Sequence, residues 1–295
     1  MTGEKKKAAV FVRLGQSNAV GHGIPMDEKD KIKEPQKNVF GLSRTANQSY
    51  DNNELFWSGY TSFDMNLGEE QDDTYSVANC LAIEWQKELD KGEKLPDLYI
   101  VHIAIGAQGV TKNYMWYPDR EKKLVPGVLG VADISLYSFT EHILSLALDS
   151  FEKMGIAADF IGVHWRGGEQ DTLVLKEELE PVLKEIYEKI FSGLSDALGE
   201  EIPVVLPRIT HAQRSLENDP EGKVLESFYY INEVFCELCD ENENMQIFDV
   251  RKAPFYRSDE RGNGILMEDI VHYTPKTNKW VAGEILKEYK KRNLN

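Results

Sequence analysis

The stretch LGQSNAVGHG (Leu14–Gly23) begins at the end of an apolar run, AAVFVRL (residues 8–14). This run predicts a buried β-strand, because near-continuous apolar residues are typical of strands covered on both faces. A glycine then precedes Ser17, which is flanked by two amides, Gln16 and Asn18, and two more glycines follow within six residues. A plain surface turn needs no such arrangement. The pattern predicts a serine held at the end of a parallel strand, with backbone packed closely around it.

Four further apolar runs also predict strands, and helical patterns lie between them. The strands are expected at residues 98–105, 159–165, 202–209 and 245–250, and the helices at 77–92, 138–155, 176–194, 222–242 and 274–292. Ser138 and Gly155 are expected to cap the second helix, and Thr274 and Pro275 to open the last one. This alternation predicts a single α/β domain over residues 1–295. Its sheet should be mainly parallel, with about five strands in a three-layer α/β/α sandwich.

Two long stretches have no regular pattern. The first spans about residues 23–75 and is rich in Asn, Asp, Gly and aromatic residues, and the second spans residues 109–133. Loops of this length in a compact domain usually carry function. We expect each of them to form one wall of a pocket.

The chain is strongly acidic. Its 50 acidic and 34 basic residues leave a net charge of −16 over 295 residues. This charge disfavours nucleic acid and anionic membranes as partners and weakly favours neutral substrates. Three cysteines do not indicate a disulfide framework, no run approaches the ~18 apolar residues that span a bilayer, and no secretory signal is recognisable. A cytoplasmic location is expected, or secretion if a leader has been removed.

Chemically useful side chains fall where the predicted strands end, which is where ligands bind in parallel α/β sheets. Ser17 follows the first strand, and Asp269 and His272 precede the last helix. A serine hydroxyl becomes a nucleophile when a base removes its proton. His272 is the natural base, and Asp269 is spaced to hold its Nδ1–H. The backbone N–H groups of Ser17 and Gly109 are candidates for stabilising an oxyanion.

The other histidines have no such partner in the sequence. His22 lies five residues after Ser17, and we do not expect the loop to let it act as the base. We expect core or surface positions for His102, His142, His164 and His211. No spacing of His, Asp or Glu indicates a metal site, and no cofactor is expected.

At these residues the chain resembles the SGNH (GDSL-like) hydrolase superfamily, in particular the branch with sialate O-acetylesterase-like domains and family 6 carbohydrate esterases. The blocks at 15–18 and 269–272 match closely, and those around 104–111 and 165–171 are degenerate. The resemblance implies a flavodoxin-like fold and metal-free removal of acetyl groups from sugars. It assigns Ser17 as nucleophile, Asp269 as acid and His272 as base. The expected partner is a small-molecule or oligosaccharide ester, and the oligomeric state is left open.

The block at 165–171 departs from the family pattern. The family has a glutamine there that donates to the oxyanion, and this chain has Gly167. Loss of one such donor costs on the order of 10²–10³ in rate. Gln108 is our preferred replacement and Arg166 the other candidate. The second backbone donor is expected to be Ala107, Gln108 or Gly109.

Three polar residues are expected to support this site. Glu169 keeps the family's acidic position, where we expect it to organise the loops through hydrogen bonds rather than to perform chemistry. Asn18 is expected to brace the serine loop through its amide, as Asn often does in turns, and Gln16 to support the same loop.

Aromatic residues in the long loops have two interpretations. Trp57, Trp116 and Tyr117 would suit one face of a sugar, or they would anchor the loops. Two alternatives to an acetylesterase also stay open at this point. One is a carbohydrate-binding or regulatory protein with little turnover. The other is a lipase or thioesterase of the same superfamily, for which an apolar groove would be the sign.

Overall fold

The computed structural model describes residues 5–23, 25–47, 54–70, 73–120, 135–210 and 219–293. These residues contain a seven-stranded sheet in the order β3-β2-β4-β1-β5-β6-β7. The strands are β1 Lys6–Gly15, β2 Val39–Leu42, β3 Trp57–Gly59, β4 Asp97–Ala104, β5 Ile156–Arg166, β6 Val204–Pro207 and β7 Met245–Phe248. All neighbours are parallel except β2 and β3. The five predicted strands are β1, β4, β5, β6 and β7, and they follow the order of a flavodoxin-like sheet.

The prediction of about five strands is wrong in number, because β2 and β3 come from the stretch 23–75 that was expected to be irregular. β2 pairs in parallel with β4, and β3 pairs antiparallel with β2 at the edge of the sheet. These strands have only four and three residues, which is too short for an apolar periodicity to be recognised. Tertiary contacts support them, such as the stacking of Phe40 on Tyr99 of β4.

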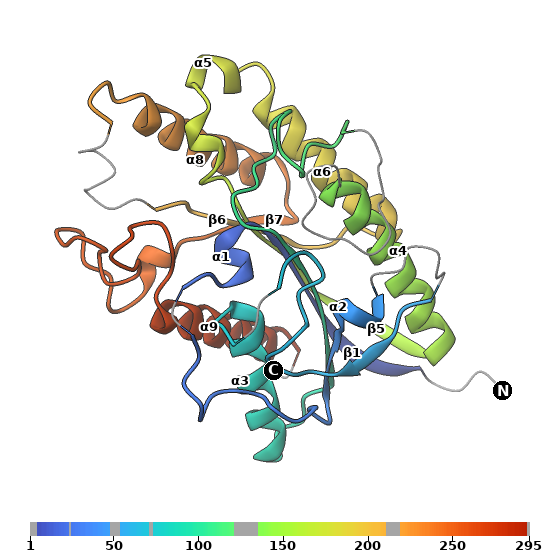
Figure 1. Ribbon diagram of the computed structural model, residues 1–295. Coiled ribbons are helices and arrows are strands. Elements are labelled where there is room, and N and C mark those ends of the chain that lie inside the picture. The colour runs from blue at the N-terminus through green and yellow to red at the C-terminus, as the bar shows by residue number, and fades with distance from the viewer. Residues whose placement is uncertain are drawn as a thin grey trace.

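Helices cover both faces of the sheet (Figure 1). On one face, α3 (Val77–Asp90) and α9 (Pro275–Asn293) share a core with Phe11 of β1. On the other face, α4 (Leu136–Met154), α6 (Leu183–Leu198) and α8 (Lys223–Glu241) share a core with Val10 and Val12. Successive side chains of β1 therefore enter opposite cores, which explains why its sequence is continuously apolar.

Two predicted helices differ from the structure. The one expected at 176–194 is two helices, α5 (Lys176–Leu179) and α6, with Pro181 in the turn between them. Proline has no N–H to donate, and its ring clashes with the preceding helical turn. α4 begins before Ser138, because the N-cap is Ser135, whose hydroxyl accepts from the Ser138 N–H. Its C-cap is Gly155, as predicted.

The remaining short elements are α1 (Ser17–Val20), α2 (Arg44–Asn47) and the 3₁₀ helices η1 (Asp171–Leu173) and η2 (Val250–Lys252). All three cysteines are free, and Cys236 and Cys239 lie on α8. Within the described ranges, no helix has the length and apolar character needed to cross a membrane.

β1 ends where the candidate serine begins. Gly15 has a φ of +135°, and a Cβ atom on it would lie 1.9 Å from the Arg166 carbonyl oxygen of β5. Only glycine fits such a position. The Gln16 N–H donates to the same carbonyl at 2.8 Å, and the chain then turns into α1. Ser17 therefore lies at the carboxyl end of β1, between β4 and β5, where ligands bind in sheets of this order.

Candidate active site

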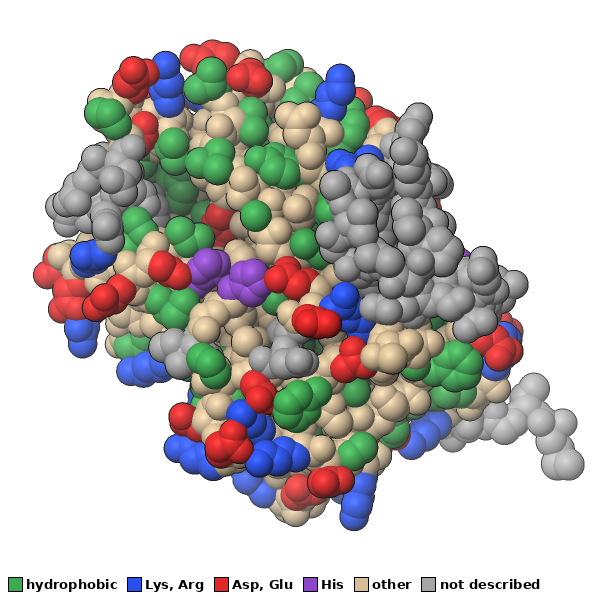
Figure 2. All heavy atoms as spheres, viewed as in Figure 1, with side chains coloured by type: hydrophobic (Ala, Val, Ile, Leu, Met, Phe, Trp, Pro, Cys, Tyr) green, Lys and Arg blue, Asp and Glu red, His purple; other side chains and the backbone are tan. Residues whose placement is uncertain are grey.

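A pocket of about 1230 Å³ opens beside Ser17. Its lining also includes His22, Glu69, Glu169 and His272. Figure 2 shows histidine side chains together in the middle of this face, with carboxylates next to them. Pockets for drug-sized ligands measure about 300–1,000 Å³, so this one has room for far more than an acetyl group.

Ser17 presents two unused polar groups to the pocket. It is the first residue of α1, so its N–H has no acceptor within the helix. Among the described residues its hydroxyl has no hydrogen-bond partner, although only 8% of the residue's surface is exposed. No hydrogen bond joins this hydroxyl to His272. Such contacts are often long in sites without substrate and shorten when substrate binds.

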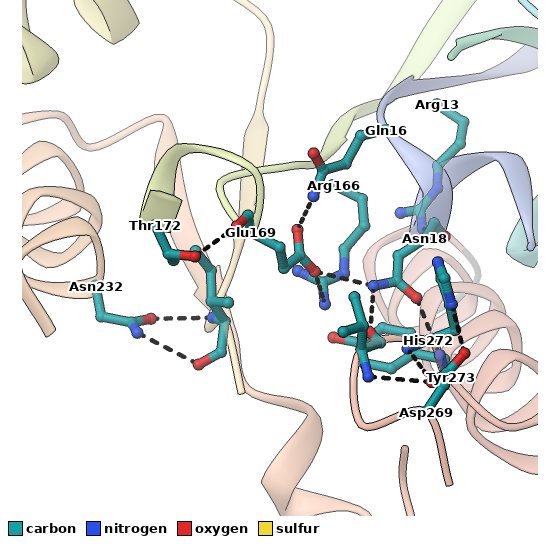
Figure 3. Close-up of polar contacts among 12 residues, drawn as sticks. Arg13, Gln16, Asn18, Arg166, Glu169, Thr172, Asn232, Asp269, His272 and Tyr273 are labelled. Carbon is teal, nitrogen blue, oxygen red and sulfur yellow. Dashed lines mark hydrogen bonds and ion pairs between the residues drawn. The ribbon is translucent and has the colours of Figure 1, made fainter. Parts of the chain in front are cut away.

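Asp269 and His272 form an acid–histidine pair in the loop before α9 (Figure 3). The His272 Nδ1 lies 2.7 Å from the Asp269 Oδ2, and the Asp269 Oδ1 accepts from the His272 N–H at 3.0 Å. Burial raises the pKa of Asp269, but its hydrogen bonds to His272 and Val271 outweigh burial and hold the pKa below its usual value. The ionised carboxylate fixes the ring through Nδ1, which leaves Nε2 as the atom that would act as a base.

The turn that brings Asp269 and His272 together is strained. Ile270 has a φ of +65°, which is rare for a β-branched residue. It lines the pocket together with Val271. Strained backbone of this kind is concentrated at functional sites.

Glu169 holds both residues that flank the serine. Its Oε2 accepts from Gln16 Nε2 at 2.6 Å, and its Oε1 accepts from Asn18 Nδ2 at 2.9 Å. Oε1 also pairs with Arg166 Nη2 at 2.5 Å (Figure 3). One carboxylate therefore fixes the serine loop from both sides of Ser17.

Asn18 joins the serine loop to the histidine loop. Its Nδ2 donates to the Val271 carbonyl at 2.9 Å, and its Oδ1 accepts from the Tyr273 N–H at 3.0 Å. Val271 and Tyr273 are the residues on either side of His272. Asn18 thus positions His272 relative to Ser17, through a contact that spans 255 residues of sequence.

The loop after β4 brings one candidate backbone donor to the pocket. The Gly106 N–H already donates to Glu69 Oε2 at 2.6 Å. Gly109 packs against Asp171, since a Cβ atom on it would lie 2.3 Å from that carboxylate. Of the three residues expected to supply the second donor, only Ala107 lines the pocket, in a left-handed conformation with φ +55°.

The side chains expected to replace the family's glutamine lie elsewhere. The Gln108 Oε1 accepts from the Met115 N–H at 3.1 Å. Arg166 is only 3% exposed, and its guanidinium pairs with Glu169. Neither residue lines the pocket, so the structure does not support either as the missing donor. The Gln108 side chain instead holds its own loop through Met115, and the Arg166 guanidinium belongs to a buried ion pair.

The aromatic residues expected to bind a sugar also lie outside the pocket lining. Trp116 is fully buried and donates from Nε1 to the Gly15 carbonyl at 3.1 Å. Trp57 stacks on Phe151 of α4, and Tyr117 is partly buried against the same core. Trp116 therefore anchors its loop to the core, and Trp57 and Tyr117 do not line this pocket.

The two long stretches contribute unequally to the pocket. The first, 23–75, supplies Arg44, Glu69 and Glu70 to the lining. In the second, residues 109–120 supply none, and residues 121–133 lie outside the described residues.

A second acid–histidine pair lies in the pocket, and the sequence did not reveal it. His22 Nε2 lies 2.8 Å from Glu69 Oε1, and the two ring centres of His22 and His272 are 5.8 Å apart. The hydrogen bond to Glu69 raises the pKa of His22 against the opposing effect of burial. Its carboxylate partner is 47 residues away in the chain, so no local spacing connects the two.

The other histidines lie away from this site. His102 and His164 are core residues, and burial lowers the pKa of both to about 3. His142 lies on α4, and His211 is outside the described residues. In the part of the chain that the structure describes, no three His, Cys, Asp or Glu side chains gather to hold a metal ion.

Asp171 fastens the loop after β4 and gives a first prediction. Its carboxylate accepts from the N–H groups of Val110 at 3.0 Å and Thr111 at 3.3 Å, and its complete burial raises its pKa to about 7. Below about pH 4 the group is protonated in the folded and the unfolded chain, and between about pH 4 and 7 only the unfolded chain releases the proton. The contribution of Asp171 to the free energy of unfolding should therefore fall as the pH rises through this range. Urea unfolding of wild type and Asp171→Asn at several pH values measures this contribution as the difference between their free energies of unfolding. A difference that stays constant with pH would contradict the expectation.

The comparisons with known proteins rest on structure alone. No family model and no curated protein sequence matches the chain. The fold is similar to that of NanS, with a TM-score of 0.60 and 17% identity over 98% of this chain and 99% of that one. A protein from Arabidopsis thaliana matches with a TM-score of 0.57 and 15% identity over 96% of this chain and 98% of that one. A carbohydrate acetylesterase from Xanthomonas citri matches with a TM-score of 0.50 and 11% identity, over 95% of this chain and 55% of that one. These likenesses show a shared fold, which is consistent with the resemblance to SGNH hydrolases.

Proposed function

We propose that the protein is a serine esterase that removes acetyl groups from acetylated carbohydrate. One observation carries the proposal: the unpartnered hydroxyl of Ser17 faces the same pocket as the Asp269–His272 pair, at the carboxyl end of β1. The similarity in fold to a carbohydrate acetylesterase supports it.

The reaction would proceed through an acyl-enzyme. His272 Nε2 takes the proton of Ser17 as Oγ attacks the ester carbon. The carbonyl oxygen becomes an oxyanion, for which the N–H groups of Ser17 and Ala107 are the backbone donors. The bond to the alcohol then breaks, and His272 returns the proton to the leaving oxygen. Water attacks the acyl-enzyme with His272 again as base, which releases acetate and restores Ser17, while Asp269 stabilises the imidazolium.

Polar side chains in the pocket lining suit a carbohydrate. Arg44, Glu69, Glu169 and Gln170 all line it. Carboxylate, amide and guanidinium groups pair well with sugar hydroxyls, since together they offer both donors and acceptors. The pocket's volume also leaves room for a sugar beside the ester group.

One observation favours a second candidate, a lipase or thioesterase that takes a larger apolar group. The side of the pocket formed by η1, the end of β6 and α8 carries apolar side chains, which we call the apolar wall. The apolar wall consists of Leu173, Ile209, Val224, Leu225 and Phe228. Leu173 is 65% exposed there, and covering exposed apolar surface with a ligand is favourable.

Rates on a panel of esters test the proposal. An acetylesterase should release acetate from acetylated sugars, and its kcat/KM on 4-nitrophenyl esters should fall from acetate to octanoate. If the apolar wall binds the acyl chain, kcat/KM should instead rise by up to roughly fourfold for each methylene, since burying one contributes about 0.8 kcal/mol. Leu225→Ser should then remove the rise. Val182→Ser should not, because Val182 is exposed outside this pocket.

The panel also tests the third alternative. A folded wild-type protein that releases no product from any ester would contradict both esterase candidates. It would favour a carbohydrate-binding or regulatory protein with the same fold. Calorimetric titration with the acetylated sugars would then measure binding directly.

A further inference from the structure

The pocket contains a histidine that the mechanism above does not use. His22 follows Gly21, the C-cap of α1. Its backbone N–H donates to the Ser17 carbonyl at 3.0 Å, so its position is tied to that of the serine. Its Nε2 lies 2.8 Å from one oxygen of Glu69, and the other oxygen of Glu69 accepts from the Gly106 N–H at 2.6 Å. Glu69 therefore holds His22 against the start of the loop that carries Ala107. The ring packs closely there, since a Cβ atom on Gly106 would lie 2.7 Å from His22 Cε1.

The free nitrogen of His22 is open to the pocket. His22 Nδ1 has no hydrogen-bond partner among the described residues, and it is not among their buried unpaired atoms. The His22 side chain is 38% exposed. Two other reactive atoms of the pocket, Ser17 Oγ and His272 Nε2, also have no hydrogen-bond partner among the described residues. A substrate that reaches Ser17 therefore meets His22 Nδ1 in addition to the Ser17 hydroxyl and His272 Nε2.

The site lacks a side-chain donor where the family resemblance places one. The corresponding residue is Gly167, and a Cβ atom on it would lie 3.1 Å from the Trp165 indole. A longer side chain at this position would start against the buried indole. Gln108 and Arg166 do not line the pocket either, whereas His22 does.

We propose that His22 is a catalytic residue that donates a hydrogen bond from Nδ1–H to the oxyanion formed at Ser17, with Glu69 as its positioning residue. This inference rests on the proposed esterase function and adds a side-chain donor to the backbone N–H groups of Ser17 and Ala107. The proton remains on His22 throughout, and His272 alone transfers protons. Such a donor acts in the transition state, where the negative charge develops.

The proposal requires the two histidines to be in opposite states. His272 must be neutral to accept the serine proton, and His22 must be protonated, because a neutral ring that donates Nε2–H to Glu69 has no hydrogen on Nδ1. The titratable groups facing His22 are Glu69 on its own side of the pocket and His272 with Asp269 across it. The charge of Arg44 acts on Glu69 from a distance. The plot of kcat/KM against pH should therefore fall on its alkaline side, where His22 loses its proton.

Four variants test the proposal with a 4-nitrophenyl ester that wild type hydrolyses. His22→Ala should lower kcat by about 10²–10³ with little change in KM, the loss expected for one oxyanion donor. His22→Asn should retain most of the rate, because its amide nitrogen lies near the place of Nδ1. Its kcat/KM should no longer fall at alkaline pH, since an amide does not titrate. His22→Gln places its amide near Nε2 instead and should not restore the rate. His142→Asn, on α4, is the control for a histidine outside the pocket.

The role of Glu69 has its own matched pair of variants. Glu69→Gln removes the carboxylate from His22, so the alkaline fall should move to lower pH, and the His22 resonances in an NMR titration should move with it. Glu177→Gln removes the same charge from an exposed residue of α5 outside the pocket lining. It should leave the alkaline fall and the His22 resonances unchanged.

The outcomes separate this inference from the esterase proposal. Ser17-dependent hydrolysis with an unchanged kcat and pH profile in folded His22→Ala would overturn the role of His22 and leave the esterase intact. Equal rates in His22→Asn and His22→Gln would also overturn it, because a donor at Nδ1 must distinguish the two. Hydrolysis that does not depend on Ser17 would overturn both proposals.

Discussion

Ser17→Ala is expected to lower kcat/KM on any ester that the wild type hydrolyses by on the order of 10⁴–10⁶, to the level of the backbone donors and binding alone. Alanine removes the only oxygen that would form the acyl-enzyme. The fold should not change, because the hydroxyl has no hydrogen-bond partner among the described residues. Hydrolysis rates and thermal melting of wild type and Ser17→Ala, measured on the same preparations, give the loss in kcat/KM and show whether the fold is unchanged.

A control and a double variant sharpen this expectation. Ser58→Ala changes an exposed serine of β3 and should leave the rate unchanged. Ser17→Ala combined with His272→Ala should be about as slow as either single variant, because residues that act as a unit have non-additive effects. Ser17→Ala with more than a tenth of the wild-type rate would place the reaction elsewhere.

Glu169→Ala is expected to cost about 3–5 kcal/mol in the free energy of unfolding, because it leaves a buried charge without its partner. Arg166 would lose its carboxylate, and Gln16 and Asn18 would lose their common acceptor. A second guanidinium, Arg13, lies nearby, and burial together with the charge of Arg166 lowers its pKa to about 9. Removing Glu169 would leave the repulsion between these two cations without compensation.

Urea unfolding measures this effect against a matched glutamate. Glu177→Ala removes an exposed carboxylate of α5 and should change the free energy of unfolding by less than about 0.5 kcal/mol. A cost below about 1 kcal/mol for Glu169→Ala would mean that water or another group replaces the carboxylate, and that the serine loop is not held as the contacts indicate.

The regular part of the fold could be predicted because its signals are local. A strand buried on both faces is continuously apolar over its own length, as in β1 with Phe11 on one side and Val10 on the other. The long strands and most helix ends follow from such runs and from caps. Strands as short as β2 and β3 carry too few residues for the same signal, and Pro181 shows how one residue divides an otherwise helical pattern.

The candidate site could be predicted only in part. Gly15 and Ser17 were recognisable because the backbone needs glycine where β1 meets β5, and Asp269 and His272 because they are three residues apart. Trp116 illustrates the opposite case. A tryptophan in a loop has the same sequence signature whether it faces a ligand or the core, and here it fills the core.

The sequence by itself determined the alternation of strands and helices, the serine at the end of β1 and the acid–histidine pair before α9. Only the tertiary structure decided that Asn18 holds the histidine loop, that Glu169 holds the serine loop and that His22 meets Glu69 in the same pocket. The physical reason is the range of each interaction. Burial and backbone conformation act within one element and recur with its period. Hydrogen bonds between loops depend instead on how distant segments pack, and no spacing within one segment encodes them.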